Sequence, residues 1–513
     1  MVEHVRKRSR HPSRSPSLKC DRYKRSNNSH SPANIKRRRS KSPETNQRSP
    51  IRKPTNFPSY LDKPDLTPKV SILCQIVATT EAGRVEKVLD DTGIRVCQDD
   101  VEDVLKLSYG SPGPVVKFFR WSGHQFSDKH SPYAWNLVVD MLGKNGLFDA
   151  MWDAIKSMKA ESLVSLATFA SVFSSYVVSD RVKEAIMTFE VMNQYGVSRD
   201  IVALNSLLSA ICRDGKTSDA LEFMQIAKDK IRPDADTYAI LLEGLEKVRD
   251  AFAAKKFFNE MVMDIGWDPR NVPAYNSYLN TLLRGPDGRR EAIREFEVLS
   301  DRRCFPGTSF LKNALAECVK CEDSKRASIL WEDMVGRNVC RPDTDMYNSM
   351  ISLHCQNNDG EMATRLMDEM VFMGAFPDSQ TYNVLLRFFT KAKKLHVASI
   401  IFTEMVKNEC TPSKPNCGAA MKTFLDLGDP YMAINVWKCM LENYDSDLVE
   451  AGNMLIVGLR DLKKIPEAVK YAEGLVERGI KLNSSTWSKL KQSLVKQNKA
   501  MVYDELLKKW KTR

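Results

Sequence analysis

The sequence predicts an all-α protein, built as a solenoid of stacked helix–turn–helix repeats. The first observation is a proline that recurs at intervals of 36, 37, 36, 35 and 35 residues, at Pro233, Pro269, Pro306, Pro342, Pro377 and Pro412. The second is that apolar residues between these prolines follow the three- and four-residue spacing of amphipathic helices, twice in each interval. A fixed period of this length is typical of helical repeat arrays, because stacked pairs of helices can bury apolar faces that a lone pair cannot.

The composition of the 513-residue chain is that of a water-soluble protein, with 42% hydrophobic and 28% charged residues. No apolar run approaches the roughly 18 residues that a membrane span needs. No apolar core follows the basic N-terminus, as it would in a secretory signal. The 12 cysteines are scattered through helical segments, which favours reduced thiols over a disulfide framework. No cofactor is expected.

The chain begins with a basic segment, residues 1–66, that is rich in Ser, Arg and Pro. Residues 1–55 hold 17 Lys or Arg and 3 Asp or Glu, a net charge of +14, whereas the rest of the chain carries a net −2. The segment has too few apolar residues to offset the entropy of ordering it, so we predict that it is disordered. The net charge of +12 belongs to this segment and says nothing of the array, where a local basic stripe stays open.

Residues 67–131 are expected to form an N-terminal helical cap. Val85 and Leu89 mark one apolar helical stripe, and Val101 and Leu105 mark another. The Ser-Pro-Gly-Pro sequence at residues 111–114 interrupts the pattern, and a further helix follows it.

From Pro132 onward, each period predicts two helices and a closing loop. In residues 344–378, Met362 and Met370 belong to an apolar stripe on the second helix, and Gly374 is placed to end that helix. The proline of the loop prevents the helix from continuing. The pattern gives ten units, which are 132–165, 166–200, 201–234, 235–271, 272–307, 308–343, 344–378, 379–413, 414–448 and 449–483. Residues 484–513 are predicted to be a truncated C-terminal unit or cap.

These units resemble the pentatricopeptide-repeat family, and in particular its plant-type P-class members. Units of that family open with a Thr-Tyr-Asn-like motif and close with Gly-x-x-Pro-Asp. The matching openings are Thr237-Tyr238-Ala239, Ala274-Tyr275-Asn276, Met346-Tyr347-Asn348 and Thr381-Tyr382-Asn383. The resemblance covers residues 132–513. It implies a right-handed superhelix that binds single-stranded RNA, with each unit reading one base through two or three side chains.

The same resemblance implies the base-reading residues, which are an amide on the first helix of a unit and the last residue of that unit. An amide can both donate to and accept from a base edge, and apolar side chains of neighbouring units are expected to hold the base between them. The pairs are Asn205 with Asp234 and Asn348 with Asp378 for uracil, Asn453 with Asn483 for cytosine, and Asn383 with Ser413 and Asn136 with Ser165 for either pyrimidine. Asn276 also stands at a reading position, but its partner Gly307 leaves the base unspecified. The other units have Ala170, Ala239, Lys312 and Gly418 at this position, so the implied target is Y-n-U-n-n-n-U-Y-n-C.

No arrangement of residues predicts an enzyme or a metal site. Seven histidines, three of them in the basic segment, leave little for acid–base chemistry, and no nucleophile constellation is present. Cys318 and Cys321 have the spacing of zinc ligands, but a second pair is missing, which favours cysteines packed within a helix. The Gly-Pro-Asp-Gly sequence at residues 285–288 lacks the Lys-Ser/Thr of a phosphate loop and indicates a turn.

Two functions stay open at this point. The first is a sequence-selective RNA-binding protein that acts in RNA processing, splicing, stability or translation without catalysis. The second is a scaffold for protein partners, which the near-neutral array would suit, with a tail that binds phosphates without specificity. The tail itself allows two destinations. Its Arg- and Ser-rich, acid-poor composition is typical of an organelle transit peptide, and the family resemblance implies the mitochondrion. The basic run at residues 36–39, followed by Ser-Lys-Ser-Pro, suits a nuclear import signal instead.

Overall fold

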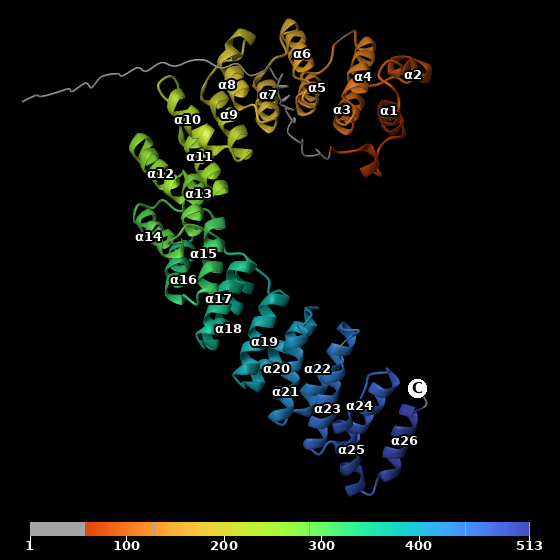
Figure 1. Cartoon of the computed structure of the whole chain (residues 1–513). Helices are drawn as coiled ribbons and strands as arrows, with labels where there is room; N and C mark the ends of the chain where they lie inside the picture. Colours follow the sequence, from red (N-terminus) through yellow and green to blue (C-terminus); the bar gives the residue numbers. More distant parts are fainter. Residues whose placement is uncertain (1–56, 128, 287, 447, 512–513) are drawn as a thin grey trace, which may run out of the picture. The chain divides into compact units, whose positions relative to one another are not determined.

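The computed structural model describes residues 57–511, except for residues 128, 287 and 447. In this part of the chain every regular element is a helix, as the sequence predicts (Figure 1). The predicted disorder of residues 1–56 lies outside the described residues. The helices form pairs that follow one another in chain order.

The odd-numbered helices are the first members of the pairs. They are α1 (Pro68–Thr79), α3 (Gln98–Leu107), α5 (Pro132–Lys144), α7 (Leu166–Val178), α9 (Ile201–Arg213), α11 (Ala235–Val248), α13 (Val272–Leu283), α15 (Thr308–Lys320), α17 (Thr344–Gln356), α19 (Ser379–Lys391), α21 (Lys414–Asp426), α23 (Val449–Asp461) and α25 (Ser484–Lys496).

The even-numbered helices are the second members. They are α2 (Val85–Thr92), α4 (Pro112–Gln125), α6 (Phe148–Ala160), α8 (Val182–Val191), α10 (Thr217–Ala227), α12 (Ala251–Ile265), α14 (Gly288–Asp301), α16 (Ser324–Trp331), α18 (Gly360–Phe372), α20 (Leu395–Lys407), α22 (Pro430–Asn443), α24 (Ile465–Glu477) and α26 (Ala500–Lys511). The short turns are η1 (Tyr60–Asp62), η2 (Met192–Tyr195) and the π-helical η3 (Glu332–Gly336).

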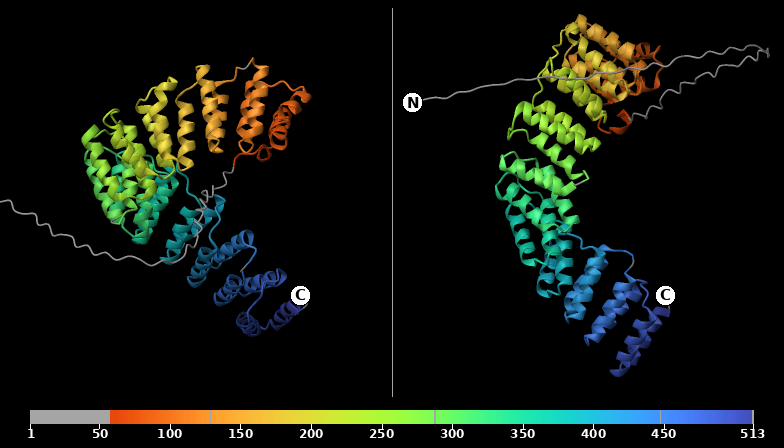
Figure 2. Two further views of the ribbon diagram at one scale, coloured as in Figure 1. Left: turned by 45° about the horizontal axis from the view of Figure 1, so that its top comes forward. Right: turned by 60° about the vertical axis from the view of Figure 1, so that its left-hand side comes forward.

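Odd-numbered helices stack directly on one another, from α1 on α3 to α23 on α25. Each also packs against its even-numbered partner, and most even-numbered helices touch the odd-numbered helix that follows them (Figure 2). Because each pair contacts mainly its neighbours, the fold is an all-α repeat solenoid. The helices α1 to α4 stack in the same way, so the predicted N-terminal cap shares the architecture of the array. The right-handed sense of the superhelix stays a prediction.

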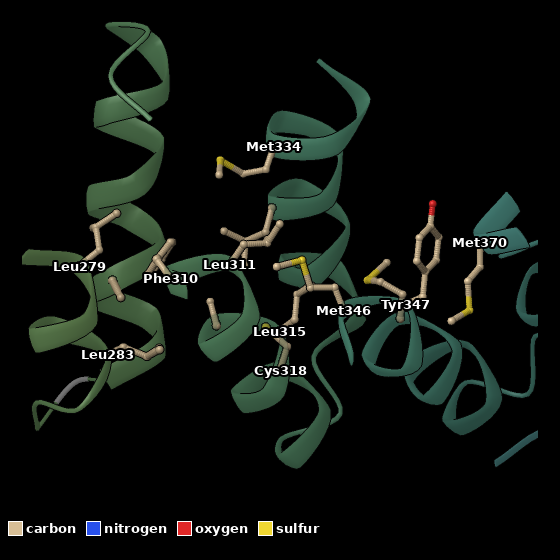
Figure 3. Close-up of a cluster of buried hydrophobic side chains, with 14 of the residues drawn as sticks. Leu279, Leu283, Phe310, Leu311, Leu315, Cys318, Met334, Met346, Tyr347 and Met370 are labelled. Atoms are coloured by element: carbon tan, nitrogen blue, oxygen red, sulfur yellow. The ribbon is translucent and has the colours of Figure 1, made fainter. Parts of the chain in front are cut away.

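The core is an apolar layer that continues from pair to pair (Figure 3). The tyrosines of the unit openings, Tyr238, Tyr275 and Tyr347, are fully buried. Figure 3 shows Tyr347 of α17 next to Met370 of α18. These aromatic rings therefore stabilise the stack and are not stacking platforms for a ligand, as predicted.

The closing residue of each predicted unit is the N-cap of the next odd-numbered helix. Asp234, for example, caps α11 by accepting a hydrogen bond from the Thr237 amide at 2.8 Å, and Asp378 caps α19 in the same way. The Pro-Asp closings therefore begin the next helix, a role that the sequence analysis missed. Helix α18 ends several residues earlier, and Gly374 follows it with a φ of 78°, the left-handed conformation that suits glycine.

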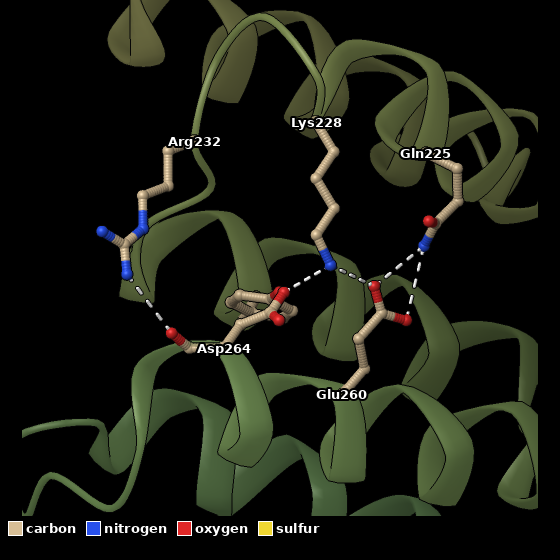
Figure 4. A network of polar contacts seen from close by, with 6 residues as sticks. Gln225, Lys228, Arg232, Glu260 and Asp264 are labelled. Atoms are coloured by element: carbon tan, nitrogen blue, oxygen red, sulfur yellow. Dashed lines mark hydrogen bonds and ion pairs between the residues drawn. The ribbon is translucent and has the colours of Figure 1, made fainter.

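Polar contacts link the even-numbered helices α10 and α12 (Figure 4). Lys228, at the end of α10, pairs with two carboxylates of α12, those of Glu260 and Asp264. Arg232 of the Arg-Pro-Asp closing donates to the backbone carbonyl of Asp264 at 3.5 Å. Arg341, in the second Arg-Pro-Asp closing, donates to the carbonyl that follows α18 at 3.0 Å. The arginine of this motif thus reaches the C-terminal end of the next even-numbered helix, where a cation is favoured.

One predicted boundary was wrong. Residues 57–66 are structured, because η1 lies there and the ring of Phe57 packs 5.7 Å from that of Tyr109. A composition averaged over the whole segment hides its apolar contacts with the core, which Phe57, Tyr60 and Leu66 make. Residues 484–511, predicted as a truncated unit or cap, hold a last pair of helices, α25 and α26, and α25 begins at the predicted residue. The rings of Trp487 and Tyr503, 5.9 Å apart, hold the two helices together.

Candidate nucleic-acid interface

The asparagines of the predicted readers share one equivalent position. Each is the fifth residue after the N-cap of an odd-numbered helix, and they are Asn136, Asn205, Asn276, Asn348, Asn383 and Asn453. The last residue of each unit caps the following odd-numbered helix. Each predicted pair therefore spans two consecutive helices of the stack, which pack against each other.

The first close pair lies between α9 and α11. Asn205 Nδ2 donates to Asp234 Oδ1 at 3.1 Å. Thr237, the third residue of α11, donates from Oγ1 to Asn205 Oδ1 at 2.7 Å. The amide of Asn205 is thus held at both ends, by an acceptor at its nitrogen and a donor at its oxygen.

The second close pair repeats this geometry between α17 and α19. Asn348 Nδ2 donates to Asp378 Oδ1 at 3.2 Å, and Thr381 Oγ1 donates to Asn348 Oδ1 at 2.6 Å. Asn348 is only 1% exposed. The contacts leave each asparagine with one Nδ2 hydrogen and one Oδ1 lone pair. An amide bonds to a base edge through two such groups, and the side chain that carries them is half-buried at Asn205 and buried at Asn348.

The carboxylates of Asp234 and Asp378 are held in their charged form. Burial acts to raise the pKa of each, but hydrogen bonds from the threonine amide, the asparagine amide and the threonine hydroxyl outweigh it. The pKa of both carboxyls therefore lies below its usual value. A charged carboxylate only accepts, so it orients the asparagine nitrogen towards itself.

Asn383 is held differently, between α19 and α21. Its Nδ2 donates to two carbonyls, those of Ser379 at 2.7 Å and Thr411 at 3.4 Å. Its Oδ1 accepts from the Ser413 amide at 2.7 Å and from Asn416 Nδ2 at 2.8 Å. The predicted partner Ser413 is therefore in contact, but the hydrogen-bonding capacity of the Asn383 amide is used within the protein.

Asn453 follows the arrangement of Asn383. Its Nδ2 donates to the carbonyls of Val449 at 2.6 Å and Lys481 at 3.0 Å, and its Oδ1 accepts from the Asn483 amide at 2.9 Å. Ser413 and Asn483 offer no carboxylate to these amides. The asparagines therefore turn towards backbone carbonyls.

The remaining two asparagines, Asn136 and Asn276, are each held through the side-chain oxygen. Asn136 Oδ1 accepts from Thr168 Oγ1 at 2.7 Å, while the predicted partner Ser165 donates its amide to the same hydroxyl at 3.2 Å. Asn276 Oδ1 accepts from the Phe310 amide at 3.0 Å. In all six units the asparagine thus bonds to the start of the following odd-numbered helix.

The side chain three residues before each asparagine lies one turn back on the same helix face. It is apolar and exposed on α5 and α9, where Tyr133 and Val202 are 51% and 57% exposed. On α17 it is Asp345, beside Asn348. An exposed apolar side chain, Val202, thus lies beside Asn205, whereas the carboxylate of Asp345 stands at the equivalent position beside Asn348.

A second repeating position carries cations that the sequence analysis missed. The thirteenth residue after the N-cap is basic in seven units, at Lys144, Arg213, Lys247, Arg284, Lys320, Lys391 and Lys496. It lies about three turns beyond the exposed position described above, on the same helix face. Comparing every position of the repeating unit between units, and not only the first and last motifs, would have revealed this stripe in the sequence.

The C-terminal helix pair adds a local excess of positive charge. Residues 484–511 hold seven lysines and two acidic residues, although the array as a whole carries a slight negative charge. Lys489 lies on α25 seven residues before Lys496, which is two turns along the same face. A basic surface thus exists in spite of the overall charge.

In α15 the position of the asparagine, the fifth residue after the N-cap, is occupied by Lys312. Its ammonium group pairs with Asp345 and, at 3.6 Å, with Asp343. Both carboxylates belong to the start of α17. This unit therefore has a salt bridge where α9 and α17 have an amide.

The structure supports the packing interpretation for Cys318 and not for Cys321. Cys318 is fully buried, and burial raises the pKa of its thiol to about 12, whereas Cys321 is exposed at the end of α15. Among residues 57–511, as far as they are described, no cluster of His, Cys, Asp or Glu is arranged to hold a metal ion. No helix in the same part of the chain is long and apolar enough to cross a membrane.

Comparison with known sequences finds one family of repeats. The profile described as the PPR repeat family matches residues 199–247 and 342–391, and that of the PPR repeat matches residues 133–163, 167–197 and 380–410. A mitochondrial pentatricopeptide repeat-containing protein of Arabidopsis thaliana is 36% identical over 160 residues, which is 31% of each chain. A second one from the same plant, also mitochondrial, is 24% identical over 442 residues, 83% of this chain and 76% of its own. The chain thus spans about a third of the first relative and about three quarters of the second.

Comparison with solved structures finds helical repeat proteins. The maize pentatricopeptide repeat protein PPR10, in complex with an 18-nt psaJ RNA element, aligns with a TM-score of 0.42 and 19% identity over 86% of this chain and 68% of its own. Yeast Rmd9p, in complex with a 16-nt target RNA, aligns with a TM-score of 0.32 and 14% identity over 87% of this chain and 96% of its own.

Proposed function

The chain belongs to the pentatricopeptide repeat family, and on that premise we propose that it is a sequence-selective single-stranded RNA-binding protein. It is a plant-type P-class member that acts in RNA processing, splicing, stability or translation. The RNA lies along the stack of odd-numbered helices, with one base to a unit.

The observation that carries this proposal is the contact of Asn205 with Asp234, repeated by Asn348 with Asp378. A helix cap needs no amide partner, since Asp343 caps α17 without an asparagine in the preceding unit. In both pairs a free amide hydrogen and a free lone pair stay beside a charged group. Three odd-numbered helices separate α9 from α17, so we expect two uridines with three nucleotides between them.

The other asparagines contribute less to selectivity in this proposal. The amides of Asn383 and Asn453 donate both hydrogens to backbone carbonyls. A base can use them only after the side chain rotates and gives up those bonds. The target is then centred on U-n-n-n-U, and the outer pyrimidine positions of the longer motif are tolerant.

The basic stripe and the C-terminal lysines supply the contacts to phosphate. They recur with the period of the units, as the phosphates of a strand read one base to a unit would. Such contacts give affinity without sequence information and release counterions, so binding weakens steeply with salt.

The chain needs no catalytic residue for this role. An array that occupies a single strand blocks a nuclease or prevents a competing hairpin by exclusion alone. The alternative is a scaffold for protein partners, which the net charge of −2 on residues 56–513 would suit. A salt titration separates the two, because contacts with phosphate give a steep negative dependence of affinity on salt.

We place the protein in the mitochondrion, because both Arabidopsis relatives compared above are named mitochondrial. The alternative is the nucleus, from the basic run at residues 36–39. A fluorescent fusion of the full chain in plant cells should label mitochondria. Nuclear fluorescence that disappears when the four basic residues are replaced by alanine would assign the nucleus.

The function is tested by selecting RNAs from a random single-stranded pool with the full chain. We expect enrichment of U-n-n-n-U. The variant Asn348→Thr, with Asp378 kept, should change the preference at one uridine towards guanine, and an unchanged preference would show that the assignment of units to bases is wrong. Binding that a peptide of residues 1–56 reproduces without the array would favour the scaffold.

A further inference from the structure

The hydroxyl group of Thr381 has one hydrogen and three polar neighbours. Its Oγ1 lies 2.6 Å from Asn348 Oδ1 and 3.0 Å from Asp378 Oδ1, and it accepts from the Asp378 amide at 3.1 Å. The shorter contact takes the hydrogen, so the hydroxyl donates to the asparagine oxygen. Thr237 repeats this arrangement at 2.7 Å from Asn205 Oδ1 and 2.9 Å from Asp234 Oδ1.

Each asparagine amide is therefore fixed in one of its two orientations. The reverse orientation would place the amide oxygen against the carboxylate, where neither atom can donate. The amide nitrogen would then face the threonine oxygen, which could accept from it only if the hydroxyl hydrogen turned from the asparagine to the carboxylate. Both threonines are buried. Lost bonds in such a site are not replaced by water at no cost.

We propose that Thr237 and Thr381 are positioning residues that make Asn205 and Asn348 select uracil over cytosine. Each threonine belongs to the unit after the one it controls. The proposal rests on the proposed RNA-binding function, and it adds a third residue to each of the two base-reading pairs.

The chemistry of the two pyrimidines explains why orientation selects between them. Uracil presents the O4 acceptor next to the N3–H donor, whereas cytosine presents the N4–H donor next to the N3 acceptor. An amide can pair with either edge, but nitrogen and oxygen must exchange places between the two. An amide fixed in one orientation can therefore form both hydrogen bonds with only one of the two bases, whereas an amide that is free to turn can form them with either.

Two other units of the chain show what the arrangement requires. Asn453 is followed by Thr486 at the equivalent position, but its unit closes with Asn483 and its amide turns to the backbone. Asn383 is followed by Asn416, whose Nδ2 donates to its oxygen at 2.8 Å. At Asn453 a threonine without the closing aspartate does not hold the amide, whereas Thr168, after the closing Ser165, still donates to Asn136 Oδ1 at 2.7 Å. The hydroxyl and the carboxylate work together.

The test measures the ratio of affinities for uracil and cytosine at one nucleotide. The probes are two synthetic RNAs with the sequence that the wild-type full chain selects, differing only by U or C at the nucleotide whose preference Asn348→Thr alters. The Thr381→Val variant should lower the U-to-C ratio at this nucleotide about fivefold, the factor that corresponds to one net hydrogen bond. Its ratio at the nucleotide of Asn205 should not change.

Two further variants separate positioning from stability. Thr381→Ser keeps the hydroxyl and should keep the ratio. Thr403→Val makes the same change on α20, where the hydroxyl bonds only to Ser399 of its own helix at 2.7 Å, and should have no effect on the ratio. A loss of folded protein lowers binding of both RNAs equally and cancels in the ratio. If Thr381→Val does not fold, Thr237→Val gives the same measurement at the nucleotide of Asn205.

The outcomes are distinct. A lowered ratio that serine restores supports the proposal. A wild-type preference for U that the valine variants leave unchanged overturns this proposal and leaves the RNA-binding function standing. A wild-type chain that shows no preference at any nucleotide overturns the proposed function and this proposal with it.

Discussion

Replacing Asp378 with alanine should destabilise the array more than the loss of a helix cap. The carboxylate caps α19 at the Thr381 amide, at 2.9 Å, and such caps contribute about 1 kcal/mol. The same carboxylate accepts from Asn348, which is 1% exposed. Its removal leaves a buried amide hydrogen without that partner, at a cost of about 1–3 kcal/mol. The expected loss is therefore about 2–4 kcal/mol in the free energy of unfolding around α17 and α19.

The chain supplies a matched control at the preceding unit boundary. Asp343 caps α17 at the Met346 amide, also at 2.9 Å, but has no asparagine partner. Its ion pair with Lys312 is exposed and contributes little. Asp343→Ala should therefore cost only the cap, about 1 kcal/mol.

Native-state hydrogen exchange is the suitable assay, because a repeat array opens in parts and a single unfolding midpoint would average over them. The slowest amides of α19 report Asp378→Ala, and those of α17 report Asp343→Ala. A double-mutant cycle with Asn348→Ala should give a coupling energy of about 1 kcal/mol. Equal losses for the two aspartates, with no coupling to Asn348, would show that the contact between Asn348 and Asp378 contributes nothing to stability.

Three further outcomes are expected. The pKa values of Asp234 and Asp378 are lowered in the folded protein, so the stability that these carboxylates contribute is complete above the unfolded-state pKa of about 3.9 and is lost as pH falls through the folded-state values. Asp234→Asn should therefore flatten the acid side of the plot of unfolding free energy against pH. An unaltered plot would contradict the conclusion that Asp234 is charged. Trp437→Ala, which empties a fully buried site, should lower the unfolding free energy by about 3–5 kcal/mol in urea titrations, and Trp437→Phe by less. Lys489→Gln with Lys496→Gln should weaken RNA binding equally for all sequences and reduce the slope of log affinity against log salt by about 1.4, whereas an unchanged slope would place the phosphates elsewhere.

The fold could be predicted from the sequence because its main signal is local and repeated. The spacing of Pro342 and Pro377 and the apolar stripes between them depend only on residues within one unit. The burial of Tyr347 was expected for the same reason. The cap role of Asp378 was missed because the Pro-Asp sequence was interpreted as the end of one helix, whereas the aspartate bonds forward to the next.

The candidate site was predictable only in part. The family resemblance paired Asn348 with Asp378, and the structure brings the two side chains into contact, while their role in reading a base stays a prediction. The orientation of an amide depends on contacts about 30 residues away, and no local pattern carries that information. The sequence therefore could not tell that Asn383 bonds to backbone carbonyls while Asn348 keeps a free hydrogen.

The cap geometry has a consequence for how such a chain can be cut and rejoined. A unit that ends in sequence at Asp378 does not end there in space, because that residue and Thr381 complete a site begun by Asn348. A gene duplication or a designed exchange that joins chains directly after the aspartate separates the site from its threonine. Exchanges that carry the first three residues of the next helix with the donor unit keep the site whole, so the transferable module is offset from the repeat by one turn of helix.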